Sequence, residues 1–128
     1  DRVSRLPPPL ALVGTAAEVA VGRDVYAVGY PAFDPRNDAG AMEDIFGDIF
    51  YVKRFAPGAV MAMDAARRRL THDCTTLGGN SGSCIVDFST HRVCGLHFGG
   101  AFQVENRAVQ LAMLREDPAL TPFGLNFV

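Results

Sequence analysis

The chain has 128 residues, 48% of them hydrophobic and 20% charged, which is the size and composition of one globular domain with its own core. Twelve basic residues against fourteen acidic ones give a formal net charge of −2, so there is no electrostatic case for nucleic acid or an anionic membrane as partner. No apolar run approaches the ~20 residues that a membrane-spanning helix needs. These classes are excluded, and the function has to be sought in local motifs.

The three cysteines, Cys74, Cys84 and Cys94, are an odd number, spaced ten residues apart. An odd number leaves at least one thiol unpaired within the monomer, which argues against a disulfide-framed secreted domain and leans toward an intracellular protein, although the cysteines alone leave the compartment open. The spacing lacks the short Cys-x-x-Cys pair of structural zinc sites. We expect no metal and no organic cofactor, and three buried thiols that act as small hydrophobic side chains.

The first half of the chain opens with an expected extended connector, residues 1–9, because its three consecutive prolines cannot donate backbone hydrogen bonds. Short apolar segments follow, separated by turn residues such as Pro57-Gly58. Apolar residues between 42 and 50 recur at helical spacing, which predicts one or two helical turns. The strands expected in this half are 18–21, 25–29, 50–55 and 59–63.

The second half continues the pattern of short strands. A basic run at 67–69 is expected to be a solvated strand edge rather than a binding patch. The expected strands are 71–74, 84–88, 92–98 and 102–111, with a break at Gly99-Gly100 and a short helical turn at 112–116. Short strands between Gly and Pro turns are typical of an antiparallel sandwich or barrel, so the predicted fold is all-β, with residues 10–128 as its one domain.

A glycine-rich loop at 77–83, reading L-G-G-N-S-G-S, lies between two of the expected strands. Glycines on both sides of Ser81 permit backbone angles that side chains forbid, and they let N–H groups converge on one point, as an oxyanion hole requires. The loop is not a phosphate-binding P-loop, because no Gly-Lys-Ser/Thr follows it. It is not a strand-to-helix nucleophile elbow either, because position 83 is serine rather than glycine. Taken alone, it is either an ordinary loop or a nucleophile loop.

The surroundings of this loop decide between these alternatives. The segments T-T-L-G-G-N-S-G-S at 75–83 and V-C-G-L-H-F-G-G at 93–100 resemble the C-terminal half of chymotrypsin-like (trypsin-like) serine peptidases, most closely the bacterial branch that includes the glutamyl endopeptidases. Upstream, V-G-R-D-V-Y-A-V-G-Y-P-A at 21–32 is similar to a stretch of bacterial trypsin-like peptidases. The resemblance covers about residues 14–112 and implies a six-stranded antiparallel Greek-key barrel, the second of that fold's two barrels.

The resemblance also implies catalytic roles within the loop. Ser81 is the acyl-forming nucleophile, and the backbone N–H groups of Gly79 and Ser81 form the oxyanion hole. Asn80 belongs to the same catalytic motif. Cys84 departs from the family, which usually has proline there, and this puts the start of the following strand in doubt.

For substrate binding, the resemblance implies that Phe98, Gly99 and Gly100 pair in β fashion with the substrate backbone. Thr76 and His97 take the positions that line the specificity pocket of the glutamyl branch. A hydroxyl and an imidazole can both donate hydrogen bonds to a carboxylate, so we expect an acidic residue before the scissile bond, at P1. The alternative for His97 is an ordinary strand histidine with satisfied hydrogen bonds.

The chain offers Ser81 no convincing general base. His97 is assigned to the pocket and His91 to a hairpin tip, and His72 lacks the Thr-Ala-Ala-His-like setting of the family's base. In the family the histidine and the orienting aspartate come from the first barrel. We therefore expect an N-terminal barrel, as a separate chain or a missing segment, to supply both, so that this chain is a piece of a larger or processed polypeptide or an isolated half. The alternative is a non-catalytic descendant that binds peptides, against which the retained G-G-N-S-G-S argues.

Overall fold

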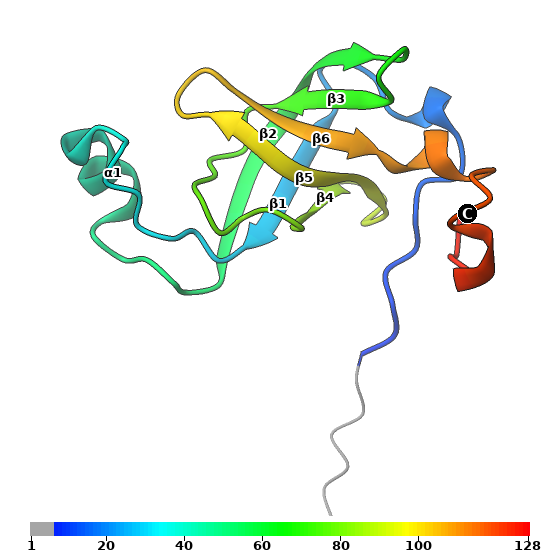
Figure 1. The fold of residues 1–128 in the computed structure, drawn as a ribbon, viewed down its shortest axis with the longest axis horizontal. Coiled ribbons are helices and arrows are strands. Elements are labelled where there is room, and N and C mark those ends of the chain that lie inside the picture. Colours follow the sequence, from blue (N-terminus) through cyan, green and yellow to red (C-terminus); the bar gives the residue numbers. More distant parts are fainter. Residues whose placement is uncertain (1–6) are drawn as a thin grey trace, which may run out of the picture.

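The computed structural model describes residues 7–128, which form a closed barrel of six antiparallel strands (Figure 1). The strands are β1 (Asp24–Gly29), β2 (Arg54–Asp64), β3 (Arg69–His72), β4 (Cys84–Asp87), β5 (Val93–Ala101) and β6 (Glu105–Gln110). Their order around the barrel is β1-β2-β3-β6-β5-β4, and β4 returns to pair with β1 and close the sheet. The predicted all-β, six-stranded antiparallel barrel is confirmed. None of the helices in the described residues has the length and apolar character to cross a membrane.

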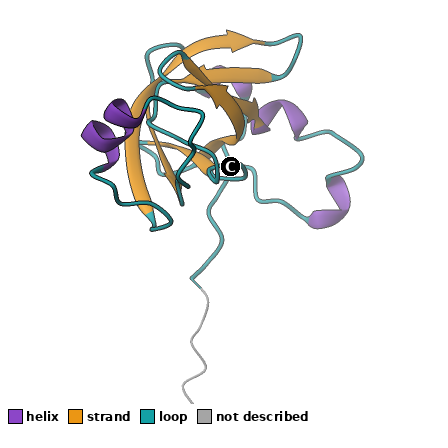
Figure 2. Ribbon diagram, turned by 60° about the vertical axis from the view of Figure 1, so that its left-hand side comes forward, coloured by secondary structure: helices purple, strands orange, loops and turns teal. Residues whose placement is uncertain are grey.

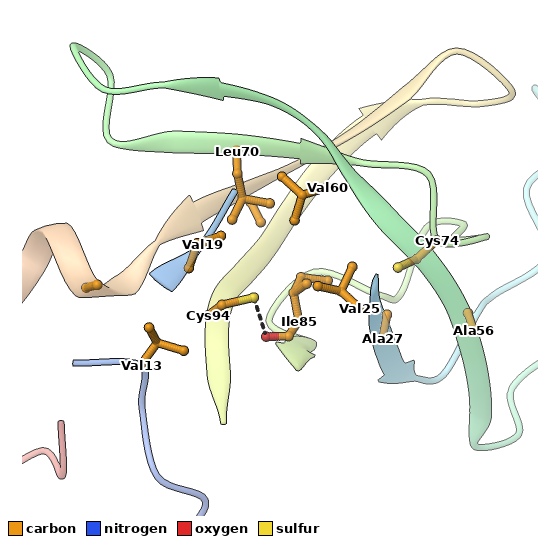
Figure 3. Close-up of a cluster of buried hydrophobic side chains, with 12 residues drawn as sticks. Val13, Val19, Val25, Ala27, Ala56, Val60, Leu70, Cys74, Ile85 and Cys94 are labelled. Atoms are coloured by element: carbon orange, nitrogen blue, oxygen red, sulfur yellow. Dashed lines mark hydrogen bonds between the residues drawn. The ribbon is translucent and has the colours of Figure 1, made fainter. Parts of the chain in front are cut away.

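The barrel encloses its core because each strand turns alternate side chains inward. In β1, Val25 and Ala27 are buried, whereas Tyr26 and Val28 face outward and are partly exposed. Figure 3 shows side chains from several strands meeting in the interior. The buried cluster consists of Val13, Val19, Val25, Ala27, Ala56, Val60, Leu70, Cys74, Ile85, Cys94, Ala108 and Ala112.

All three cysteines are free thiols, and two of them belong to this core. Burial raises the pKa of Cys74 and of Cys94 to about 12, and Cys94 Sγ donates to the Ile85 carbonyl at 3.3 Å (Figure 3). Both act as small hydrophobic side chains, as predicted. Cys84 is only half-buried, so the prediction was wrong for this residue. Within residues 7–128, no group of three or more His, Cys, Asp and Glu is placed to hold a metal ion.

The predicted turn at Pro57-Gly58 is wrong, because β2 runs through both residues as one eleven-residue strand. Pro57 lies opposite Tyr26 of β1, whereas pairing of β2 with β3 begins only at Val60. The proline therefore lies where one side of the strand is not yet paired, and its missing N–H costs no ladder hydrogen bond. A side chain at Gly58 would meet the backbone nitrogen of Cys74 at 2.6 Å, so glycine here permits a close approach of chain segments.

The predicted break at Gly99-Gly100 is also wrong, since β5 continues to Ala101 and pairs with β6 at both glycines. A side chain at Gly100 would lie 2.6 Å from the Glu105 carbonyl. The glycine therefore serves the close approach of β6 and does not end the strand.

The segment 18–21, predicted as a strand, is not one: it begins within a 3-10 turn at Ala16–Glu18. Glu18 Oε1 accepts hydrogen bonds from the backbone N–H and the hydroxyl of Thr15, at 3.1 and 2.9 Å. This Thr-x-x-Glu capping pattern outweighs the local β-branched composition.

The remaining boundaries differ from the prediction by a few residues. The strand expected at 71–74 is β3, the one at 102–111 is β6, and the helical turn at 112–116 is a 3-10 turn at Leu111–Leu114. A third 3-10 turn, at Thr121–Phe123, was not predicted. Of the expected connector 1–9, positions 1–6 lie outside the described residues, and 7–9 contain no helix or strand.

A 24-residue insertion between β1 and β2 carries helix α1 (Ala39–Phe46). Asp38 caps the helix by accepting from the Ala41 N–H at 2.8 Å, and Gly47 ends it with φ +59°. The predicted one or two helical turns are confirmed, although the helix begins at Ala39 rather than at residue 42. The insertion and the C-terminal 3-10 turns lie at opposite ends of the barrel (Figures 1 and 2). The apolar face of helix α1 contributes to a second small core. This core consists of Met42, Phe46 and Leu77, with Ile45, Phe50 and Phe102 packed against them.

Candidate active site

The glycine-rich loop connects β3 to β4 and turns sharply at two glycines. Gly79 and Gly82 both have φ +89°, a region that L side chains rarely adopt. Between them, Asn80 is buried, and its side-chain amide donates to the Leu77 carbonyl at 3.1 Å. Asn80 thus braces the loop from inside, and Ser81 is exposed at its tip.

The backbone N–H groups around Ser81 fall into two sets. The Asn80 N–H is used within the loop at 3.2 Å, and the Gly82 N–H donates to the His97 carbonyl of β5 at 2.8 Å. The N–H groups of Gly79 and Ser81 have no acceptor among residues 7–128. Two amides without acceptors beside an exposed hydroxyl are what an oxyanion hole requires.

The hydroxyl of Ser81 donates to the carbonyl of Phe98 on β5, at 3.3 Å. All three histidines lie in the described part of the chain, and none of them hydrogen-bonds Ser81 there. His91 lies 3.3 Å from the Tyr26 hydroxyl at the hairpin tip, whereas the other two histidines pair with each other. The observed partner of Ser81 is thus a carbonyl, not a base.

A cavity of about 390 Å³ lies on one side of Ser81. The predicted site residues that line it are Thr76, Ser81, His97, Gly99 and Gly100. Phe98 does not line it, because strand alternation turns its side chain outward, where it is 41% exposed beneath the Arg69 guanidinium, 5.1 Å from the ring centre. Only the backbone of Phe98 faces the site.

A second histidine lies behind His97. His72 of β3 is fully buried, with its Nε2 3.1 Å from His97 Nδ1. The other nitrogen of His72, Nδ1, is buried without a hydrogen-bond partner among the described residues. A buried N–H without an acceptor is rarer and costlier than an unused lone pair, so we assign the proton to His72 Nε2, which donates to His97 Nδ1. His97 Nε2 then carries an N–H for the cavity that this residue lines.

Burial lowers the pKa of both histidines. The pKa of His72 falls to about 4, because desolvation penalises the imidazolium and His97 adds repulsion. The pKa of His97 also lies below its ordinary value, through desolvation. Both rings are therefore neutral at pH 7.

The buried His72 predicts an acid-labile fold. In the unfolded state His72 has a pKa of about 6.5 and binds a proton below that pH. In the folded state the same ring stays neutral until the pH approaches its lowered pKa of about 4. Stability present above pH 6.5 is therefore lost as the pH falls toward 4, by about 3 kcal/mol from this residue. We expect denaturant melts of His72→Leu to show a smaller loss between pH 7 and 4.5 than wild type. Parallel pH profiles of the two proteins would contradict this.

The hydroxyl of Thr76 is already engaged within the protein. It donates to Asn106 Oδ1 at 2.6 Å, and Asn106 Nδ2 donates to the Cys74 carbonyl at 2.8 Å. A carbonyl only accepts, which fixes the amide orientation and leaves Asn106 Oδ1 as the acceptor for Thr76. Thr76 can donate to a substrate carboxylate only after its hydroxyl rotates away from Asn106, whereas the Nε2–H assigned to His97 has no acceptor within residues 7–128.

The insertion before β2 supplies a further wall of the cavity through Asp34 and Arg36. Arg36 donates to the Asp34 carboxylate at 2.6 and 2.8 Å, and these hydrogen bonds lower the pKa of Asp34 to about 2. The two opposite charges offset each other at the cavity wall. Beside this neutralised pair, His97 is the cavity residue that can gain a proton when a negatively charged ligand binds.

Four residues of this site were missed by the sequence reasoning: His72 as partner of His97, Asp34, Arg36 and Asn106. Asn106 lies opposite Gly100 across β5 and β6, a relation that only the strand register reveals. The triplet Asp34-Pro35-Arg36 carried a signal, since opposite charges two residues apart around a proline favour a local ion pair.

The closed six-stranded barrel, with its serine loop between β3 and β4, has the architecture of a barrel of the chymotrypsin-like peptidase fold. The chain belongs to the trypsin-like peptidase domain family, whose model matches residues 2–96. A relative from Lysobacter enzymogenes, named a probable serine protease, is 36% identical over 138 residues, which cover 95% of this chain and 35% of the relative.

Solved structures show the same fold. The active form of the Rv3671c protease of M. tuberculosis matches with a TM-score of 0.61 at 22% identity, over 94% of this chain and 50% of that one. Its inactive form gives 0.59 at 22% identity, over 92% and 56%. The chain thus spans about a third of the length of the curated relative and about half that of the solved protease.

Proposed function

We propose that this chain is the nucleophile-bearing barrel of a serine endopeptidase that cleaves peptide bonds through an acyl-enzyme on Ser81. The observation that carries the proposal is the exposed Ser81 hydroxyl between two N–H groups without acceptors in residues 7–128, beside a side-chain-sized cavity. Ser81 Oγ attacks the scissile carbonyl as its proton passes to a base, and the N–H groups of Gly79 and Ser81 stabilise the oxyanion. The protonated base then gives its proton to the leaving amine, and water releases the acyl group.

The base and its orienting carboxylate are assigned to residues outside this chain. The support is that none of the three histidines hydrogen-bonds Ser81 in the described structure, and that two of them, His72 and His97, hydrogen-bond each other. The solved protease carries as much chain again beyond the half that matches this one. A second barrel, in the same polypeptide or as a partner, is therefore the proposed source of the histidine and aspartate.

The substrate backbone is proposed to add to β5. Pairing of β5 with β4 ends at Leu96, which leaves residues 98–100 with an unpaired backbone on that side, next to Ser81. An extended peptide can form main-chain hydrogen bonds with such an edge. This orientation places the P1 side chain in the cavity lined by His97.

The chemistry of that cavity supports an acidic P1 residue. A carboxylate there would accept from His97 Nε2 and favour the imidazolium, which turns a neutral contact into a charge-assisted one. Asp34 does not oppose this, because Arg36 already neutralises it.

Fluorophosphonate labelling tests the proposed nucleophile. In the full-length protein that carries this sequence, we expect one covalent adduct that maps to Ser81 and disappears in Ser81→Ala. Labelling of another residue, or labelling that survives the substitution, would overturn the assignment. Peptide binding without labelling or turnover, with the rest of the protein present, would instead support the non-catalytic peptide-binding domain.

The choice between Glu and Gln at P1 tests His97. We expect wild type to prefer the Glu substrate by about tenfold, and His97→Gln to abolish the preference. The wild-type preference should be larger at pH 6 than at pH 8, since the pKa of His97 is lowered by burial and protonation on binding is easier at lower pH. The preference and its change with pH are measured by comparing kcat/KM for the Glu and Gln substrates at pH 6 and pH 8.

The exposed His91 provides the matched control, because it lies at the hairpin tip and does not line the cavity. His91→Gln should keep the Glu preference and its pH dependence. A preference that His97→Gln leaves unchanged would remove His97 from the specificity pocket.

A further inference from the structure

Two peptide groups carry the N–H donors assigned to the oxyanion hole, Gly78–Gly79 and Asn80–Ser81. A trans peptide group is planar, and its N–H and C=O point in opposite directions. A hydrogen bond that the carbonyl accepts therefore sets the direction in which the N–H of the next residue points. The partner of each carbonyl is part of how the hole is built.

The two carbonyls take their partners from different parts of the chain. The Asn80 carbonyl accepts from the Ser83 N–H at 2.9 Å, within the nucleophile loop itself. The Gly78 carbonyl accepts from the Ala32 N–H at 2.7 Å, and Ala32 belongs to the insertion between β1 and β2. The loop thus orients one donor of the hole, and the insertion orients the other.

The peptide between Gly78 and Gly79 is the one that needs an external restraint. Because neither residue has a Cβ, sterics do little to resist rotation of the peptide group between them. The Gly79 N–H has no acceptor within residues 7–128. The hydrogen bond from Ala32 is therefore the one that holds this peptide plane in the described structure.

The insertion is itself anchored where it meets the loop. The Pro31 carbonyl accepts from the Tyr51 N–H at 2.8 Å, which ties the two ends of the insertion together. Helix α1 packs through Met42 and Phe46 on Leu77, the residue just before the two glycines. The segment that carries the Ala32 N–H is thus fixed relative to the peptide that it holds.

We infer that Ala32 is a positioning residue of the oxyanion hole, whose N–H keeps the Gly79 N–H directed toward Ser81. A rotated peptide would turn a carbonyl oxygen toward the developing oxyanion and repel it. The inference rests on the proposed function and extends it, because it makes the insertion, and not only the G-G-N-S-G-S motif, a determinant of kcat. The contact joins two residues of this chain, so it does not depend on which surfaces other parts of the protein cover.

Ala32→Pro tests this role, because proline has no N–H to donate. In the full-length protein we expect kcat for a peptide amide substrate to fall by about 10²-fold, the cost of losing one oxyanion-hole donor. KM should change far less, since the lost contact acts on the transition state. Steady-state kinetics and a denaturant melt on the same preparation measure activity and folding.

Ala39→Pro is the matched control, the same substitution in the same insertion. Ala39 is the exposed first residue of α1, where proline is favoured, and its N–H has no acceptor within residues 7–128. This variant should keep the wild-type kcat. A backbone ester, with lactic acid in place of Ala32, removes the same N–H without a proline ring and should give the same loss of kcat, and an ester at position 39 is its control.

A folded protein that keeps the wild-type kcat without the Ala32 N–H would overturn the inference. So would equal losses of kcat at positions 32 and 39, or a loss that falls on KM. Unfolding of both the proline and the ester variant at position 32 would also overturn it, since the hydrogen bond would then serve the fold rather than the hole. If the wild-type protein forms no adduct on Ser81, the proposed function fails, and this inference with it.

Discussion

Replacing Ser81 by alanine is expected to lower kcat/KM for peptide hydrolysis by about 10⁵-fold in the full-length protein, because the attacking oxygen is removed. The substitution should not affect folding, since Ser81 is exposed and its hydroxyl makes one hydrogen bond, to the Phe98 carbonyl at 3.3 Å. Steady-state kinetics and a denaturant melt on the same preparation separate the two effects.

Ser83, two residues away, provides the control for this variant. It lies in the same loop but is partly buried and is not among the described residues that line the cavity. Ser83→Ala should retain most of the activity. If Ser83→Ala abolished hydrolysis and Ser81→Ala did not, the nucleophile would be misassigned.

Replacing Gly79 by alanine is expected to lower kcat by about 10²- to 10³-fold, the cost of losing one oxyanion-hole donor. A Cβ on Gly79 would lie 2.6 Å from the Tyr30 carbonyl and 3.2 Å from Ala32, so the backbone has to shift and its N–H moves with it. KM should change far less than kcat, since the loss falls on the transition state.

Gly82→Ala is the matched control, because Gly82 has the same φ of +89° but no atom within 4 Å of its would-be Cβ. Backbone strain at positive φ should cost each variant roughly 1–2 kcal/mol of stability, and Gly79→Ala should lose more because its Cβ also meets the Tyr30 carbonyl. Only Gly79→Ala should lose the large factor in kcat. Equal losses of kcat in both variants would indicate general damage to the loop rather than the loss of an oxyanion-hole donor.

The sequence contained most of what fixes the fold class and the nucleophile loop. The alternation of buried and partly exposed side chains in β1 is a local signal of a strand. The glycines on either side of Ser81 are a local signal of positive φ angles in the loop. The order and separation of the glycine motifs at 75–83 and 93–100 indicated the trypsin-like peptidase family, and the matching family model confirms it. The strand at 84–88 and the start of the one at 92–98 were predicted to within one residue, because each is an apolar run next to turn residues.

What sequence reasoning missed depends on contacts between distant segments. Pro57 and Gly99 look like strand breakers, yet each lies where pairing tolerates it, and this depends on the neighbouring strand. The contact between His72 and His97 joins residues 25 apart, and the one between Thr76 and Asn106 joins residues 30 apart. Neither follows from a local pattern, because barrel closure sets which strand faces which.

The most direct test of the account is to isolate the covalent intermediate. The full-length protein is mixed with an ester substrate that has glutamate at P1, quenched in acid within milliseconds, digested, and analysed by mass spectrometry. We expect the acyl part of the substrate to be attached to the peptide that contains Ser81, in an amount that rises with substrate concentration and vanishes in Ser81→Ala. Rapid hydrolysis of the substrate with no adduct on Ser81, or with the adduct on another residue, would contradict it.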